Sequence, residues 1–91
     1  MRIAWTPAAA SDLEQVSDYL YEQSPETALR IVRQIYSAGS DLKTFPNRGR
    51  PGKGEDTREL VIPGLPYVII YDLRGHNVRI LRVLHGARRW P

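Results

Sequence analysis

The side chains best suited to chemistry lie in and beside the stretch LHGARRWP, residues 84–91. An imidazole titrates near neutral pH, so His85 could act as a general acid or base. Arg82 and Arg88 could hold a phosphodiester and stabilise the charge that develops on it. These three residues are the candidate catalytic set of a small, metal-free endoribonuclease. The alternative is that His85 is a polar residue at a strand end, surrounded by solvated arginines.

The same stretch also has the composition of a binding surface. Arg88 is followed by Arg89 and Trp90, and arginine and tryptophan are enriched in binding hot spots. Trp90 could stack on a nucleobase. A tryptophan at the end of a small domain more often folds back over the core, and we favour that position for Trp90. Trp5, beside the first predicted helix, is also expected in the core.

Metal and nucleotide sites are disfavoured. His76 and His85 lie at opposite ends of one predicted strand, and the chain has no cysteine, so a ligand set with metal-site spacing is missing. The stretch RGRPGKGED lacks the GxxxxGK[ST] pattern, and no strand leads into a helix there. We therefore expect no metal and no cofactor, and interpret this stretch as a connector.

Size and charge set the broad class. Ninety-one residues are expected to form a single domain over residues 1–91. The formal net charge is +3 and is unevenly placed: acidic residues gather between Asp12 and Glu22, whereas basic residues dominate from Arg48 onward. A basic C-terminal half is typical of a protein with an acidic or polyanionic partner, but also of a merely soluble basic surface.

The cellular compartment is inferred from features that the sequence lacks. It has no cysteine, no apolar core of a secretory signal, and no run of the roughly 18 apolar residues needed to span a membrane. We expect a soluble cytoplasmic protein that makes no membrane contact.

Two helices are predicted after a short strand at residues 2–5. Thr6-Pro7 and Ser24-Pro25 each place a hydroxyl at the N-cap and proline at the first helical position. The acidic residues of the first helix, Asp12 among them, are assigned to its polar face. The apolar stripe of the first helix comprises Ala9, Leu13, Val16 and Leu20. The apolar stripe of the second comprises Ala28, Leu29, Val32, Ile35, Tyr36 and Leu42.

Three strands are predicted in the last third, at residues 58–62, 67–73 and 78–84. Short turns at 63–66 and 74–77 separate them, so consecutive strands should pair antiparallel. Residues 44–56 are interpreted as a polar loop. The predicted order is β-α-α-β-β-β, an α+β fold in which a helical hairpin packs on a small antiparallel sheet.

Strict alternation in the last strand places Arg82 on one face and Arg79 on the other, each between aliphatic residues. Neither face is therefore wholly apolar. One arginine is expected to reach over the sheet edge or to line a groove on the face away from the helices. Alternation alone does not decide which.

As a whole the chain resembles the RelE/ParE superfamily, the toxins of bacterial type II toxin–antitoxin modules. The resemblance covers nearly all of the chain. It rests on size, on the predicted element order, and on the segments FPNRGRPG, TRELVIPGLPYVIIYDL and VRILRVLHGARRWP. A strand with Arg-Glu-Leu, then Tyr-x-Ile-x-Tyr, then a last strand running into His-x-Ala-Arg-Arg is typical of the ParE-like branch.

The two branches of this superfamily differ in target. RelE-like members enter the ribosome and cut messenger RNA, whereas ParE-like members poison DNA gyrase. The nuclease pattern has basic residues where this chain has Glu59 and Val61, and an arginine where it has Val68. Arg88 matches a further arginine of the pattern. The pattern also uses a tyrosine further along the chain, and this sequence has no residue at that position. A nuclease would therefore have to be rebuilt around His85.

The resemblance implies a toxin that inhibits growth by binding DNA gyrase and is neutralised by a cognate antitoxin. A ribosome-dependent mRNA endonuclease using His85 is the alternative, and a degenerate toxin that only binds its partner is a third. We favour a protein without enzymatic activity. The antitoxin is expected to wrap the toxin with an acidic segment and to contact operator DNA on behalf of the complex. The sequence assigns no antitoxin-binding residues. The implied target-binding residues are Arg58, His85, Arg88, Arg89 and Trp90.

Overall fold

The computed structural model describes residues 1–86, and its elements follow the predicted order with one short strand added. A strand, β1 (Arg2–Trp5), leads into two helices, α1 (Pro7–Gln23) and α2 (Pro25–Asp41). Four more strands follow in the described chain: β2 (Arg50–Pro51), β3 (Thr57–Val61), β4 (Tyr67–Arg74) and β5 (Asn77–His85).

These strands form one sheet in the order β1-β5-β4-β3-β2. Strands β2 to β5 pair antiparallel, whereas β1 pairs parallel with β5, Ile3 lying opposite Val78. The α+β fold is confirmed, but the prediction of a wholly antiparallel sheet was wrong. Strands β1 and β5 are far apart in sequence, so no hairpin turn dictates their relative direction.

Each helix begins at its predicted proline. The Thr6 hydroxyl accepts a hydrogen bond from the Ala9 N–H at 3.2 Å, and the Ser24 hydroxyl accepts one from the Thr27 N–H at 3.3 Å. Ser24 also ends α1, because its N–H donates to the Leu20 carbonyl at 2.9 Å. A single residue therefore joins the two helices in a tight hairpin. Neither helix in residues 1–86 is long and apolar enough to cross a membrane.

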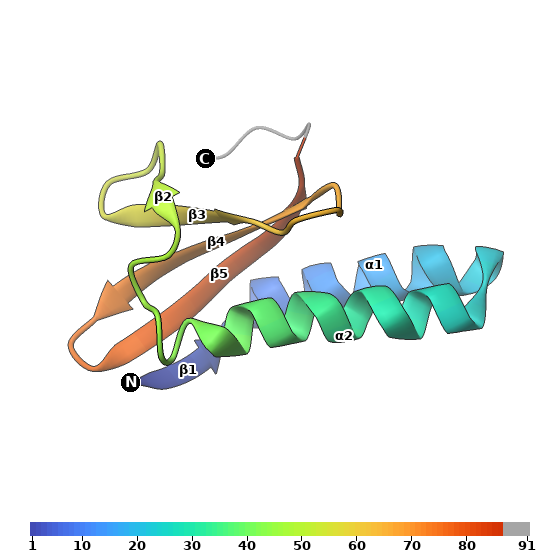
Figure 1. The fold of residues 1–91 in the computed structure, drawn as a ribbon, viewed down its shortest axis with the longest axis horizontal. Coiled ribbons are helices and arrows are strands. Elements are labelled where there is room, and N and C mark those ends of the chain that lie inside the picture. The colour runs from blue at the N-terminus through green and yellow to red at the C-terminus, as the bar shows by residue number, and fades with distance from the viewer. Residues whose placement is uncertain (87–91) are drawn as a thin grey trace.

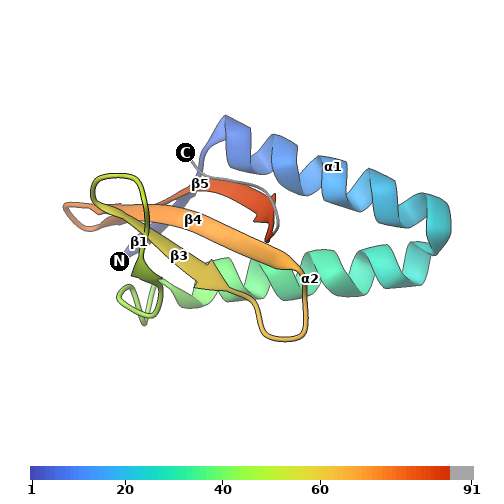
Figure 2. The same ribbon diagram turned by 90° about the horizontal axis from the view of Figure 1, so that it is seen from above.

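Both helices lie on one face of the sheet (Figure 1) and run side by side in opposite directions (Figure 2). The core between the two layers includes the fully buried side chains of Ile35, Ile69, Tyr71 and Ile80. Each helix has 17 residues and is thus about 25 Å long. In both views the turn of the hairpin extends beyond the end of the sheet.

The predicted apolar stripe of α2 is wrong at two positions. Ile35 is fully buried, but Leu29 is 54% exposed and Tyr36 is 56% exposed. The Tyr36 ring stacks on Trp5 with centroids 5.7 Å apart. Trp5 is therefore half-buried at the margin of the core, where its indole packs against the core cluster, rather than inside it.

The connector between α2 and β3 is held against the sheet by Tyr71. The Tyr71 hydroxyl donates to the Pro46 carbonyl at 2.7 Å and accepts from the Gly49 N–H at 2.8 Å. A Cβ at residue 49 would lie 2.7 Å from the Tyr71 ring, so this approach requires glycine. The predicted loop is thereby fixed at the sheet edge, where two of its residues form β2.

Candidate functional site

A β-bulge in β5 decides where its polar side chains lie. Tyr71 pairs with Ile80, but Ile70 pairs with Arg82, so Leu81 is an extra residue that shifts the alternation. His85 therefore lies opposite Tyr67 and shares the face of the sheet that the helices cover. The predicted alternation of this strand is wrong beyond Ile80 for this reason.

Asp12 joins α1 to the bulged part of β5. Its carboxylate accepts hydrogen bonds from Arg82 Nε at 2.7 Å and Nη2 at 3.0 Å, and from the Val83 N–H at 2.9 Å. The pKa of Arg82 is raised by the hydrogen bond to Asp12. Arg82 is thus the arginine that reaches over the sheet edge, where its charge is balanced by the Asp12 carboxylate.

Sequence analysis missed Asp12, which was assigned to the polar face of its helix. The residue is only 8% exposed. Its position three residues after Ala9 and four before Val16 places it beside the apolar stripe, and this spacing was the available signal. The spacing could not show that a strand edge with an unpaired N–H lies there.

Arg79, the other arginine of this strand, makes its ion pair on the face of the sheet away from the helices. Its Nε donates to Asp72 Oδ1 at 2.8 Å, and the pKa of Arg79 is raised by this side-chain hydrogen bond. Asp72 is 8% exposed. Strand pairing places the two residues directly opposite each other, so this bidentate pair joins β4 to β5.

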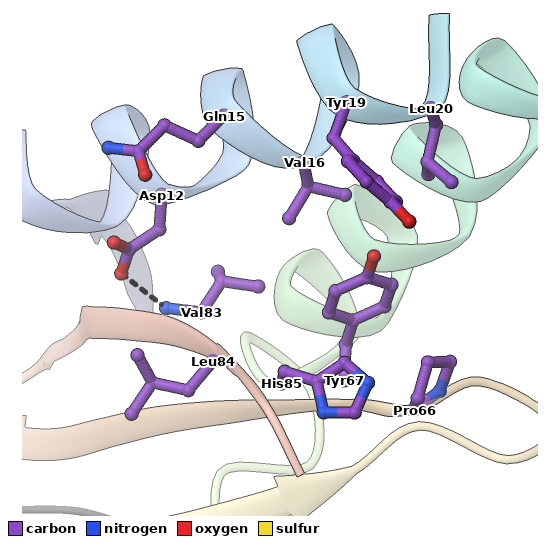
Figure 3. Close-up of a pocket in the computed structure, with 10 residues that line it drawn as sticks. All are labelled: Asp12, Gln15, Val16, Tyr19, Leu20, Pro66, Tyr67, Val83, Leu84 and His85. Carbon is purple, nitrogen blue, oxygen red and sulfur yellow. Dashed lines mark hydrogen bonds between the residues drawn. The ribbon is translucent and has the colours of Figure 1, made fainter. Parts of the chain in front are cut away.

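A pocket of about 440 Å³ opens between α1 and the adjoining ends of β4 and β5. Tyr19, Tyr67 and His85 supply three rings to its wall, and the two tyrosine hydroxyls point toward one another (Figure 3). The Tyr67 and His85 rings meet edge to face at 6.0 Å. Burial, followed by the neighbouring Tyr19, raises the pKa of Tyr67, so this phenol is neutral at physiological pH. We call this cavity the tyrosine pocket.

A second cavity of about 430 Å³ lies at the opposite edge of the sheet, along β3. Strand β2 pairs only with Arg58 and Glu59, so no described strand covers the outer side of Val61. Because the Ile62 N–H donates inward to the Tyr67 carbonyl, the ladder alternation directs the N–H and carbonyl of Val61 outward. We name this cavity the β3 groove. Its lining comprises Ala38, Arg48, Arg50, Glu59, Leu60, Val61, Ile62 and Pro63.

The β3 groove combines apolar surface with positive charge. Val61 is 49% exposed. Arg48 lies over the ring of Phe45, 5.0 Å from its centroid, and Arg50 pairs with Glu59 at 3.2 Å. The arrangement can receive an extended or helical segment with apolar and acidic side chains.

The other predicted target-binding residues divide between two outcomes. Arg58 donates to the Gly49 carbonyl at 2.8 Å and to the Asn47 carbonyl at 3.4 Å, so its guanidinium supports the connector. Arg88, Arg89 and Trp90 lie outside the described residues. The structure therefore places His85 and Arg82 together near the end of β5, whereas Arg58 lies on β3, near the opposite edge of the sheet.

The residues at the positions of the nuclease pattern, Glu59, Val61 and Val68, lie together on the face of the sheet away from the helices. Val61 pairs with Val68, and Val68 pairs with Leu84, so an apolar row crosses three strands. Glu59, two residues before Val61, carries a negative charge. His85 faces the opposite side of the sheet from this row. Within residues 1–86, no group of three or more His, Cys, Asp or Glu side chains could hold a metal ion.

Comparison with known proteins adds a family to this geometry. A family model described as the ParE toxin of the type II toxin–antitoxin system parDE matches residues 3–90. Y4kP of Sinorhizobium fredii, named as a toxin candidate, is 39% identical over 90 residues, which cover 99% of this chain and 93% of Y4kP. Toxin RelE2 of Caulobacter vibrioides is 34% identical over 87 residues, covering 96% of this chain and 97% of RelE2.

A solved structure shows the same fold. A chain of the chromosomal ParDE toxin–antitoxin system of P. aeruginosa superposes with a TM-score of 0.84 and is 30% identical. The match covers 93% of this chain and 95% of that one.

Proposed function

Because this chain belongs to the ParE toxin family of type II toxin–antitoxin systems, we propose that it arrests growth by binding DNA gyrase and performs no catalysis itself. A cognate antitoxin neutralises it. The observation that carries the proposal is the apolar row of Val61 and Val68 beside Glu59. In-line cleavage of RNA without a metal needs cations on the phosphate, whereas at these positions the chain has two aliphatic side chains and a carboxylate that is itself paired with Arg50.

The positions of Arg82 and His85 support the same conclusion. The Arg82 guanidinium is engaged by both oxygens of Asp12. His85 lies beside Tyr67 on the helix-covered face, with the sheet between it and the apolar row. A phosphodiester on that row would lie on the other side of the sheet from His85.

A gyrase assay tests this function directly. Purified wild-type protein should block supercoiling by gyrase and lead to accumulation of cleaved DNA. The Arg88→Ala/Arg89→Ala/Trp90→Ala variant, which removes the predicted anchors, should lose both effects. Wild-type protein that arrests growth in cells but leaves purified gyrase active would exclude gyrase as the target.

The alternative function is cleavage of messenger RNA on the ribosome, with His85 as acid or base. One relative of this chain carries the name RelE2, and His85 is exposed at a pocket. In this case His85→Ala should abolish growth arrest while leaving folding and antitoxin binding intact. A fully toxic His85→Ala protein would eliminate the nuclease.

The β3 groove is the surface that best fits the antitoxin. Its floor is apolar, no described strand covers the adjoining backbone edge at Val61, and Arg48 supplies positive charge, while Arg50 is already paired with Glu59. An acidic, partly apolar segment would pair with the open edge and place a carboxylate near Arg48. The complex would then contact operator DNA through the antitoxin. Tight, sequence-specific binding of duplex DNA by the toxin alone at physiological salt would contradict this division.

A further inference from the structure

The tyrosine pocket has a different chemistry from the β3 groove. Its rings come from Tyr19, Tyr67 and His85, and Gln15 contributes an amide (Figure 3). Neither tyrosine hydroxyl nor the Gln15 amide oxygen carries a positive charge. Electron-rich ring faces and neutral oxygen acceptors favour a cation over an anion.

The charges around this pocket point the same way. Helix α1, which forms one wall, contains four acidic residues and no lysine or arginine. Among residues 1–86, the guanidinium of Arg82 is bonded to the lining residue Asp12 and is balanced by that carboxylate. An anionic segment would thus meet an acidic helix with no unbalanced arginine on its described lining, whereas a basic segment would meet a field of opposite sign.

We propose that the tyrosine pocket receives an arginine or lysine side chain from a basic segment of the toxin's protein target. The inference rests on the proposed function, in which the toxin acts by binding a protein. The cation lies against the rings of Tyr19 and Tyr67, and the Gln15 amide oxygen accepts one of its hydrogen bonds. Because Tyr67 is a neutral phenol, its hydroxyl can also accept.

Target and antitoxin then use opposite edges of the sheet. The pocket lies beside β5, and the groove lies beside β3, with β4 between these strands. The acidic antitoxin is drawn to Arg48 of the groove, and the basic target segment is drawn to the acidic helix. Substitutions in the pocket should therefore weaken target inhibition while leaving antitoxin affinity unchanged.

Two variants of opposite charge at one position test whether the side chain that occupies the pocket is basic or acidic. Gln15 is exposed, so Gln15→Lys and Gln15→Glu should both fold. With a basic occupant, Gln15→Lys should raise the toxin concentration for half-inhibition of purified gyrase about tenfold. Gln15→Glu should leave it unchanged or lower it. The reverse order would mean an acidic occupant and would overturn the proposal.

Two tyrosines on one helix provide a matched control. Tyr19 and Tyr21 are both 62% exposed, but only Tyr19 lines the pocket. Tyr19→Ser should weaken inhibition about tenfold, whereas Tyr21→Ser should behave as wild type. Equal activity of all four variants would show that the pocket is not used. Loss of antitoxin binding by Gln15→Lys would make the antitoxin the occupant instead, which also overturns the proposal.

Growth arrest in cells separates this inference from the choice of gyrase. If wild-type protein arrests growth without inhibiting gyrase, gyrase is not the target. The same four variants, scored by growth arrest, still decide whether the pocket binds a basic segment of another protein. If wild-type protein inhibits gyrase and Tyr19→Ser inhibits it equally well, the gyrase function stands and the pocket proposal fails.

Discussion

The two edges of this sheet are finished in different ways. Beyond the end of β1, the exposed edge of β5 is closed from within the chain: Thr6 donates to the Ile80 carbonyl through its N–H and its hydroxyl, and Asp12 accepts from the Val83 N–H. At the other edge, β2 covers only two residues of β3 and leaves Val61 uncovered. An edge with unpaired backbone groups is a template for a further strand.

The difference separates stability from binding. The closed edge satisfies its own hydrogen bonds, so substitutions there should destabilise the fold. The open edge lacks a partner in the described chain, so substitutions there should affect association and leave stability nearly unchanged. Variants at each edge test this distinction between stability and binding. The largest change in the free energy of unfolding is expected for a substitution of Asp12.

Asp12→Ala should lower the free energy of unfolding by about 2–4 kcal/mol. The substitution leaves the Arg82 guanidinium and the Val83 N–H without their carboxylate. The loss is below that for a deeply buried pair because the Arg82 side chain is 27% exposed. Urea unfolding measures it, with Glu14→Ala on the same helix as an exposed control that should change stability by less than about 0.5 kcal/mol. Equal stability of the two variants would show that the edge does not need Asp12.

Tyr71→Phe should lower the free energy of unfolding by about 1–3 kcal/mol. It removes the hydroxyl that joins the Pro46 carbonyl to the Gly49 N–H, and the ring still fills the core. The connector beside the β3 groove should also exchange its amide hydrogens faster. Thermal unfolding and hydrogen exchange measure the two effects. Unchanged protection of the Gly49 amide would mean that the connector is held by other contacts.

Val61→Asp should weaken antitoxin binding by about tenfold or more, because it places a negative charge where an acidic segment docks. Its effect on stability should stay within about 0.5 kcal/mol, since Val61 is half exposed. Val61→Thr keeps the branched shape and serves as the control. Titration with purified antitoxin measures both. If Val61→Asp bound as tightly as Val61→Thr, the groove would not be the antitoxin site.

Alkaline pH should reduce stability through Tyr67. Its pKa is raised above 10.0 in the folded protein by burial and by Tyr19, so the unfolded chain loses this proton at lower pH. Stability from this group is complete below pH 10 and falls as pH rises through the folded pKa. Between pH 9 and 11, the melting temperature of Tyr67→Phe should decrease less than that of the wild type. The difference should correspond to the ionisation of about one tyrosine. An identical decrease in both proteins would exclude Tyr67 as the cause.

Local chemistry was enough to determine the elements. In Thr6-Pro7 and Ser24-Pro25, a hydroxyl residue at the N-cap followed by proline sets the start of each helix. The turns before β4 and β5 contain Gly64 and Gly75, whose φ angles are positive, +77° and +56°. Residues 67–73 and 78–84 read as strands because β-branched and aromatic side chains dominate them. The motifs in these strands also carried the resemblance to the ParE-like toxins, which the family match confirmed.

Other features depended on contacts between distant segments. The bulge at Leu81 turns His85 toward the helices and sends Arg82 over the edge, and it arises from pairing with β4 rather than from the local sequence. Asp12 is buried because the uncovered edge of β5 lies beneath α1. Leu29 and Tyr36 have the spacing of core residues, yet they are 54% and 56% exposed, and Tyr36 stacks on Trp5 at the margin of the core. Periodicity defines which side chains share a face of an element, but only the tertiary structure decides which neighbour, if any, covers that face.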